Sequence, residues 1–430
     1  MAREFLSIRT NPLGFLQRAW QRYGDVVQFP IPSPPSYLVN DPAAVRRVLV
    51  EVPREYSKST IQYRSLAAVT GNGLLVADHD RWREQRQLVQ PAFHPGTLER
   101  VHDISEEIAD RVAAQWSRPA VVDMDSAMME AALEVVGHAL FGADLSASAS
   151  ELTSATLAAL DVVVGRARTP ITPPSWVPTP GNRKLARSLN TLNAAVDQII
   201  AERSSVDAGS ADMLDLLLAG LDRESVRDEV VTFIVAGHET VASALTWTWA
   251  LLAAHPEVQR QLHDELDSVL GGRAPSMEDV LALPYTRAVF DEALRLYPPA
   301  WLITRTALND DELGGRDIPA GALIIMSPYL LHRHPDVWSD PESFNPTRTF
   351  DRNAFIPFGN GPRLCIGRDF AYIEAITLLA VLAQRGFVSY PGSGATKERG
   401  SEGVPAYTPL VTMRPANGLH LRVTPRSVSQ

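Results

Sequence analysis

Apolar residues recur at intervals of three and four positions through the middle of the chain, and this spacing predicts amphipathic helices. Helices are expected over residues 82–89, 104–116, 126–140, 152–164, 185–200 and 256–270. Two earlier segments, Asp25 to Ile31 and Ser36 to Asp41, have the composition of short strands and flank a turn rich in proline and serine. Further short strands are expected over residues 301–306, 322–326 and 410–414. The pattern predicts a mainly α fold with a minor β part.

No internal repeat, Gly/Ser-rich linker or block of like charge divides the 430 residues. Although a chain of this length often has two domains, we expect a single domain over residues 1–430 that is large enough to surround a bulky cofactor. One proline-rich segment, Arg168 to Asn182, interrupts the helices. A loop of that length is typical of a lid or an entry region.

Composition and charge narrow the class of protein. The net charge of −10 argues against a nucleic-acid partner, because nucleic-acid binding normally requires a basic face. The single cysteine excludes internal disulfides and metal sites that need several thiolates, and it suits a reducing cytoplasm. The most apolar stretch, Val230 to Ala254, is interrupted by His238 and Glu239. About fourteen mostly apolar residues follow, fewer than the roughly 20 that span a membrane. We therefore expect a cytoplasmic protein without a membrane anchor.

The lone cysteine, Cys365, lies between a Gly/Pro-rich loop and a long apolar helix expected to begin near Ile366. The partial positive charge of a helix N-terminus would stabilise a thiolate, which is an iron ligand. Gly359, Gly361 and Gly367 carry no Cβ and would let the backbone approach a flat macrocycle. A lone cysteine is more often buried and inert, so the assignment depends on its neighbours.

Those neighbours reproduce a signature. Phe358, Gly361, Arg363, Cys365 and Gly367 have the spacing Phe-x-x-Gly-x-Arg-x-Cys-x-Gly, which resembles the haem-binding loop of the cytochrome P450 family, soluble bacterial type. The resemblance implies haem b (iron protoporphyrin IX) with iron bound by Cys365. It also implies that the cofactor lies between this loop and the central long helix. Phe358 would then cover the sulfur, and Arg363 would reach a propionate.

A second motif, Ala236 to Thr240 (AGHET), lies in the long helix expected to start near Glu229. It resembles the oxygen-binding motif of the family. Ala236 and Gly237 would give a flat face for the cofactor. Glu239 and Thr240 would deliver protons during oxygen activation while bulk water is excluded, and we take these two as the catalytic pair.

Two further motifs follow the order of the family. Glu292 and Arg295 are three apart on one predicted helix, and Arg348 matches the arginine that completes a buried structural network with them. Phe350 stands one position later than in the usual form. Trp82 and Arg86, one helical turn apart, and Arg305 match donors to the haem propionates.

By family position, the substrate pocket is expected to include the proline-rich loop and a set of mainly apolar residues. These are Phe233, Ala300, Trp301, Leu302, Ile303 and Leu410. An apolar pocket fits terpenoid, polyketide, acyl or aromatic peptide-derived substrates.

The resemblance implies a haem-thiolate monooxygenase that inserts one oxygen atom of O2 into an apolar small molecule in secondary metabolism. Since no flavin- or iron–sulfur-binding region is recognisable, NAD(P)H electrons would come through a ferredoxin or flavodoxin and its reductase. Three alternatives stay open: a peroxygenase, against which Glu239 and Thr240 argue; a non-oxygenating isomerase or dehydratase; and a haem-binding sensor without catalysis.

Overall fold

The computed structural model describes residues 8, 10–31, 33–168, 173–174, 176–203, 212–392 and 403–426. Most of them lie in helices, and the strands form small sheets, so the predicted fold class is confirmed. The proline-rich loop expected from Arg168 to Asn182 is described only in part, because residues 169–172 and 175 lie outside the described ranges.

The helices occupy every segment in which the apolar spacing predicted one. They are α2 (Pro12–Tyr23), α3 (Pro42–Arg46), α4 (Ile61–Thr70), α5 (His79–Val89), α6 (Pro95–Ala114), α7 (Met124–Phe141), α8 (Ala149–Ala167), α9 (Pro180–Arg203), α10 (Met213–Gly220), α11 (Arg223–Ala254), α12 (Pro256–Leu270), α13 (Met277–Leu281), α14 (Pro284–Leu296), α15 (Pro328–Leu331) and α16 (Arg368–Arg385).

A five-stranded sheet has the order β1-β2-β8-β5-β3, with β1 at Val26–Phe29, β2 at Ser36–Val39, β8 at Leu323–Met326, β5 at Ile303–Ala307 and β3 at Tyr56–Ser57. Strand β2 pairs with β8 in parallel, and the other pairs are antiparallel. A second sheet has β12 (His420–Pro425) between β4 (Ala120–Asp123) and β9 (Gly386–Ser389). Two hairpins remain: β6 (Asp311–Leu313) with β7 (Arg316–Ile318), and β10 (Tyr407–Pro409) with β11 (Met413–Pro415).

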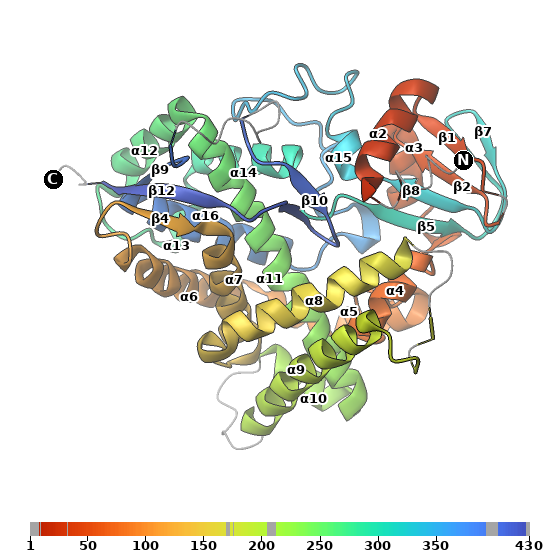
Figure 1. Cartoon of the computed structure of the whole chain (residues 1–430), viewed down its shortest axis with the longest axis horizontal. Coiled ribbons are helices and arrows are strands. Elements are labelled where there is room, and N and C mark those ends of the chain that lie inside the picture. The colour runs from red at the N-terminus through yellow and green to blue at the C-terminus, as the bar shows by residue number, and fades with distance from the viewer. Residues whose placement is uncertain are drawn as a thin grey trace.

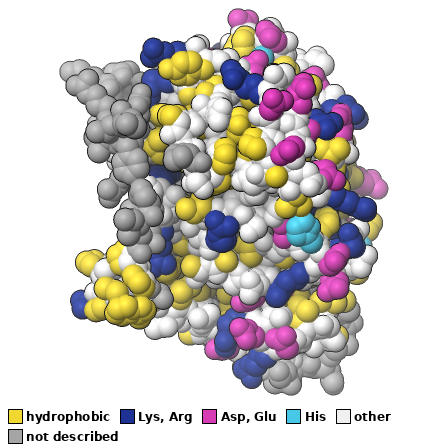
Figure 2. Space-filling model, turned by 90° about the vertical axis from the view of Figure 1, so that its right-hand side faces the viewer, with side chains coloured by type: hydrophobic (Ala, Val, Ile, Leu, Met, Phe, Trp, Pro, Cys, Tyr) yellow, Lys and Arg dark blue, Asp and Glu magenta, His cyan; other side chains and the backbone are white. Residues whose placement is uncertain are grey.

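The five-stranded sheet and α2 lie at one end of the molecule, and most helices lie at the other (Figure 1). On the surface of the sheet end, charged side chains of both signs intermix with hydrophobic ones (Figure 2). Helix α11 crosses the middle and packs against α7 and α14.

Helix α11 lies in the core of the molecule. Its start is capped by Asp222, whose carboxylate accepts the backbone N–H of Ser225 at 2.9 Å. The cap puts the start six residues before the expected Glu229, so the expectation of a helix too short to span a membrane was wrong. Both α11 and the segment Ser146–Ala167 are long and apolar enough for that by composition. However, 83% of the most apolar window of α11 is buried inside the protein, as expected of a core helix.

Two other boundaries differ from the predictions. The strand expected over residues 410–414 is present only in part: residues 410–412 form the turn between β10 and β11, in which Leu410 donates its N–H to the carbonyl of Thr412, and Met413 and Arg414 belong to β11. The helix after Cys365 starts at Arg368 and not near Ile366, with Gly367 at its N-cap position.

Candidate active site

Cys365 ends a tight loop that returns on itself before α16. Its N–H donates to the carbonyl of Phe358 at 3.0 Å, and Leu364 donates to the carbonyl of Gly361 at 3.0 Å. The Cys365 side chain is exposed, although protein atoms surround it densely. The loop therefore presents a single accessible sulfur on a rigid backbone.

The thiol is not activated by the protein alone. Burial raises the pKa of Cys365, while the N–H of Gly367 and the charge of Arg86 lower it by less. The N–H group at the helix start thus lowers the pKa of the thiol, as expected, but desolvation outweighs it. A bound metal ion reverses this balance, since a coordinating thiol is deprotonated outright.

Gly361 serves the packing of the loop. Its φ is +66°, and a Cβ there would lie 1.9 Å from the carbonyl oxygen of Leu49 in the short helix Arg47–Glu51. The structure thus explains this glycine by its contact with backbone, a reason that the sequence did not indicate. Gly237 differs from the expectation in the same way, because a Cβ there would meet the side chain of Val136 on α7 at 2.7 Å.

A buried ion-pair network holds the segment before the cysteine loop. Arg295 donates to both carboxylate oxygens of Glu292 at 2.7 and 2.8 Å, and Arg348 donates to Glu292 at 3.2 Å. The side chains of Glu292 and Arg295 have no exposed surface. His332 bonds the carbonyl of Arg295 through Nδ1 and accepts the N–H of Ile356 through Nε2. The network is thereby connected to the backbone two residues before Phe358.

Phe358 and Phe93 line the two sides of the loop. The ring of Phe358 lies 5.3 Å from that of Tyr372 on α16. Phe93 contacts Phe233 on α11 and Phe370 on α16, with ring centroids 6.0 and 6.3 Å apart. It therefore bridges the central helix and the helix after the cysteine. This role of Phe93 was not predicted, because the contacts join segments far apart in the chain.

Arginines and a tryptophan gather beside the loop. Arg363 donates to Asp78 at 2.6 Å and stacks 4.0 Å above the ring of Trp82. Arg86 donates to the carbonyl of Leu364 at 3.0 Å, next to the cysteine. Burial lowers the pKa of Arg363 to about 10. The structure thus brings Trp82, Arg86 and Arg363 together, as the sequence predicted.

Lys58 joins this cluster and was missed by sequence reasoning. Its ammonium donates to the carbonyl of Leu75, and its pKa is lowered well below the usual range by burial and then by Arg305 and Arg363. Arg305 is buried and donates to the carbonyl of Thr304. Among the described residues, Asp78 is the carboxylate that acts on both Lys58 and Arg363. A surplus of positive charge is therefore buried beside the cysteine loop.

The two residues of the expected catalytic pair point to different sides of α11. Thr240 is half-buried, like Ala236, and its hydroxyl donates to the Ala236 carbonyl at 2.8 Å. Glu239 is almost fully buried and accepts the Thr412 hydroxyl at 3.0 Å. Adjacent positions differ by about 100° around a helix, so only Thr240 shares the Ala236 face.

Glu239 is held by the β10–β11 hairpin. Arg414 lies 3.7 Å from its carboxylate and donates to Asp125 at 2.6 Å. Burial raises the pKa of Glu239, and Arg414 and Thr412 oppose that shift. The carboxyl group of Glu239 therefore lies on a different side of α11 from the accessible face that carries Thr240. Thr412 and Arg414 were not predicted, because they lie more than 170 positions away in sequence.

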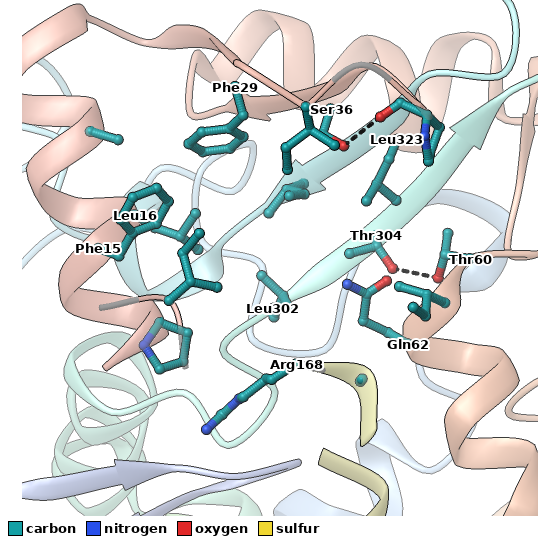
Figure 3. Close-up of a pocket in the computed structure, with 18 of the residues that line it drawn as sticks. Phe15, Leu16, Phe29, Ser36, Thr60, Gln62, Arg168, Leu302, Thr304 and Leu323 are labelled. Carbon is teal, nitrogen blue, oxygen red and sulfur yellow. Dashed lines mark hydrogen bonds between the residues drawn. The ribbon is translucent and has the colours of Figure 1, made fainter. Parts of the chain in front are cut away.

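A cavity of about 2300 Å³ opens between α2, α4, the end of α8 and the five-stranded sheet (Figure 3). Of the expected substrate residues, Trp301, Leu302 and Leu410 line it. The other three do not. Phe233 is buried against Phe93, Ile303 packs in the core below the sheet, and Ala300 is exposed.

The residues of the site fit the iron porphyrin that the resemblance implies. The accessible Cys365 sulfur suits iron, and the surplus of buried cations suits the two propionates of a haem. Lys58 and Arg363 share the carboxylate of Asp78 and are both repelled by Arg305, so an anion would relieve that repulsion.

Known proteins with a similar sequence or fold agree with the haem site that these residues indicate. The chain matches the cytochrome P450 family model over residues 4–401. It is 37% identical over 404 residues to cyclooctatin synthase of Streptomyces melanosporofaciens, covering 90% of this chain and 87% of that protein. It is 35% identical over 399 residues to cyclooctat-9-en-7-ol 5-monooxygenase of the same organism, covering 88% and 86%. The crystal structure of CYP175A1 from Thermus thermophilus superposes with a TM-score of 0.79 at 31% identity, covering 97% and 96%. An accessible cysteine sulfur beside buried cations, on a fold and sequence shared with these proteins, shows that the chain belongs to the cytochrome P450 family and is a monooxygenase.

Proposed function

We propose that this cytochrome P450 monooxygenase inserts one oxygen atom of O2 into an apolar, terpenoid-type small molecule in secondary metabolism. The observation that carries the proposal is the accessible Cys365 sulfur, with buried cations beside it. Electrons would come from NAD(P)H through a ferredoxin or flavodoxin and its reductase. A cytoplasmic location agrees with the single cysteine of the chain.

Each part of the site has a separate task. Cys365 would bind the iron of haem b, which activates oxygen when bound. Lys58, Arg305 and Arg363, with Trp82 and Arg86, would hold the propionates by charge-assisted hydrogen bonds. Ala236 and Gly367 would border the cofactor, and Phe358 would keep water from the sulfur.

Thr240 would orient the last proton donor, a water molecule, on the accessible face of α11. Its hydroxyl donates to the Ala236 carbonyl, so its oxygen is left to accept a hydrogen bond from a donor such as water. Glu239 would resupply that proton after turning from Thr412 and Arg414, which hold it in the structure. A raised pKa suits this task, since a carboxyl group that keeps its proton can donate it.

The substrate class follows from the cavity and from a relative. Trp301, Leu302 and Leu410 give the cavity wall an apolar character. The name of the relative cyclooctat-9-en-7-ol 5-monooxygenase denotes oxygenation of an unsaturated alcohol. Among the classes that fit the sequence, a terpenoid-type molecule agrees best with both.

The thiolate ligand is tested with Cys365→Ser. The holoprotein should show the red-shifted band of the ferrous carbon monoxide complex, and the variant should lose it because a hydroxyl group does not supply the sulfur ligand. Far-UV circular dichroism should stay unchanged and would show that the variant folds. Retention of the band in the variant would disprove the assignment of Cys365.

A further inference from the structure

The charged residues on the wall of the large cavity are all of one sign. Five arginines are among the lining residues that the structure describes, and no aspartate or glutamate is; they are Arg18, Arg22, Arg64, Arg168 and Arg316. The whole chain has 50 acidic and only 40 basic residues. A wall with this charge therefore departs from the composition of the protein and favours an anionic ligand.

Arg168 differs from the other four, because it is half-buried while they are exposed. It follows the last residue of α8, and Figure 3 shows its side chain in the cavity below Leu302. Its guanidinium donates to the carbonyl of Pro409 in strand β10, and burial lowers its pKa. The carboxylate that acts on it, Asp161, is itself paired with Lys184 at 2.8 Å.

Arg168 thus carries a partly desolvated charge whose hydrogen-bond partner, within the described part of the chain, is a neutral acceptor. Such a charge is costly unless an anion compensates it. The Pro409 carbonyl uses one of the five N–H donors of the guanidinium group. The planar fork of the guanidinium matches the two oxygens of a carboxylate. Leu302, Leu410 and Val164 lie on the same wall and offer apolar contact around that charge.

We propose that Arg168 binds a carboxylate group of the substrate, so that the substrate is an apolar carboxylic acid. The proposal rests on the proposed function, in which this molecule is the one oxidised. A diphosphate is a poorer match, since it would need several converging cations and Arg168 is the one half-buried cation of the five. The acid group would fix the apolar body in one orientation within the cavity.

The test compares acids with the matching alcohols by isothermal titration calorimetry on the holoprotein at pH 7.5. The pairs are abietic acid with abietinol and tetradecanoic acid with 1-tetradecanol. At least one acid should bind roughly tenfold more tightly than its alcohol. Arg168→Gln should remove most of that preference and leave the affinity for the alcohol within about twofold. Arg168→Lys should retain part of it, because the charge remains and the fork is lost.

Arg100→Gln is the matched control. Arg100 is also half-buried, donates to a backbone carbonyl (Ala139, 2.6 Å) and has a pKa lowered by burial, but it lies on α6 and does not line the cavity. Its removal should leave the acid preference unchanged. An equal loss in both variants would mean that net charge, and not a site, causes the preference.

Besides an equal loss in Arg100→Gln, four results would overturn the proposal: no preference for either acid, binding of neither acid, an unchanged acid preference in Arg168→Gln, or an equal loss of acid and alcohol affinity in Arg168→Gln. The last would show that Arg168 only fastens α8 to the β10–β11 hairpin. These results are separate from a failure of the proposed function, because that would appear as a missing red-shifted carbon monoxide band, whereas calorimetry reports acid binding whether or not the iron has a thiolate ligand.

Discussion

The Thr240 hydroxyl makes the same hydrogen bond as a second threonine of α11, which allows a controlled test. Thr240 donates to the Ala236 carbonyl and Thr248 donates to the Ala244 carbonyl, each at 2.8 Å. Thr248 is fully buried, whereas Thr240 is half-buried on the accessible face. Any effect of losing the hydrogen bond itself should be shared, and any effect on proton delivery should belong to Thr240 alone.

Thr240→Ala should therefore keep haem binding but uncouple electron use from oxygenation. Product formation should fall by roughly 10²-fold, as for loss of a general acid, while hydrogen peroxide released per NADPH rises. Thr248→Ala should keep the wild-type ratio of peroxide to NADPH. The ratio is measured with the compound that gives the largest Soret shift. A normal ratio in Thr240→Ala, or equal uncoupling in both variants, would contradict the role of Thr240.

At the scale of single residues, the sequence predicts which residues belong to the site better than it predicts the contacts that each side chain makes. Cys365 and Arg363 belong to a local motif, so their spacing was enough to find them. The orientation of Glu239 depends on Thr412 and Arg414, which approach only after folding. Lys58 has no motif around it, and its place in the cation cluster depends on Arg305 and Arg363. Contacts between distant segments leave no pattern in one sequence.

At the scale of elements, the loop before α16 depends on its contact with the short helix Arg47–Glu51. Gly361 and Gly315 both have positive φ, +66° and +75°. A Cβ on Gly315, in the β6–β7 turn, would meet nothing within 4 Å, whereas a Cβ on Gly361 would meet the Leu49 carbonyl at 1.9 Å. Substitution by alanine should strain the backbone at both glycines, because both have a positive φ, but only at Gly361 would the new Cβ clash with other backbone atoms.

Gly315→Ala should lower the free energy of unfolding by about 1–2 kcal/mol, the cost of a left-handed alanine. Gly361→Ala should lower it by at least about 4 kcal/mol, because backbone must move as well. It should also lower haem content, since the moved loop carries Cys365. Urea unfolding and the haem-to-protein absorbance ratio measure the two effects. Equal losses for both variants would show that the Leu49 contact is unimportant.

Element boundaries explain where prediction from sequence succeeded. Helix α12 was predicted over its full range, because proline marks its start and Gly271, with φ +56°, its end. The strand expected over residues 410–414 was right only at Met413 and Arg414, because residues 410–412 of that run form a turn without glycine or proline. Apolar spacing finds elements, and only turn or cap residues locate their ends.

At the scale of the whole molecule, burial favours the uncharged form of several titratable groups. Burial raises the pKa of the carboxyl groups of Glu229, Glu239 and Glu374. Burial also lowers the pKa of His238 and His263 to about 4. The histidines bind protons more tightly in the unfolded chain, so their contribution to stability is lost as the pH falls below about 6.5. The carboxyl groups bind protons more tightly in the folded protein, so their contribution to stability is lost as the pH rises.

Glu229 is the carboxyl group best suited to a test of this balance. One of its oxygens accepts the Leu74 N–H at 3.0 Å, and the other is buried with no hydrogen-bond partner among the described residues. Burial raises its pKa from 4.5 to about 7. Below about pH 4.5 the group is protonated in both states. Between these values, stability should fall with rising pH, because the unfolded chain loses the proton first; above pH 7 the loss reaches about 3 kcal/mol.

Glu229→Gln should remove this dependence, because an amide keeps an acceptor for the Leu74 N–H and does not ionise. The difference in free energy of unfolding between variant and wild type should grow by about 2.5 kcal/mol in favour of the variant from pH 5 to pH 8. Urea titrations at pH 5, 6, 7 and 8 measure it. Glu224→Gln, an exposed position on the same helix, should run parallel to wild type. If Glu229→Gln also ran parallel, the packing of α11 against the loop at Leu74 would have to admit water to the carboxylate, and the interior would be wetter there than its burial indicates.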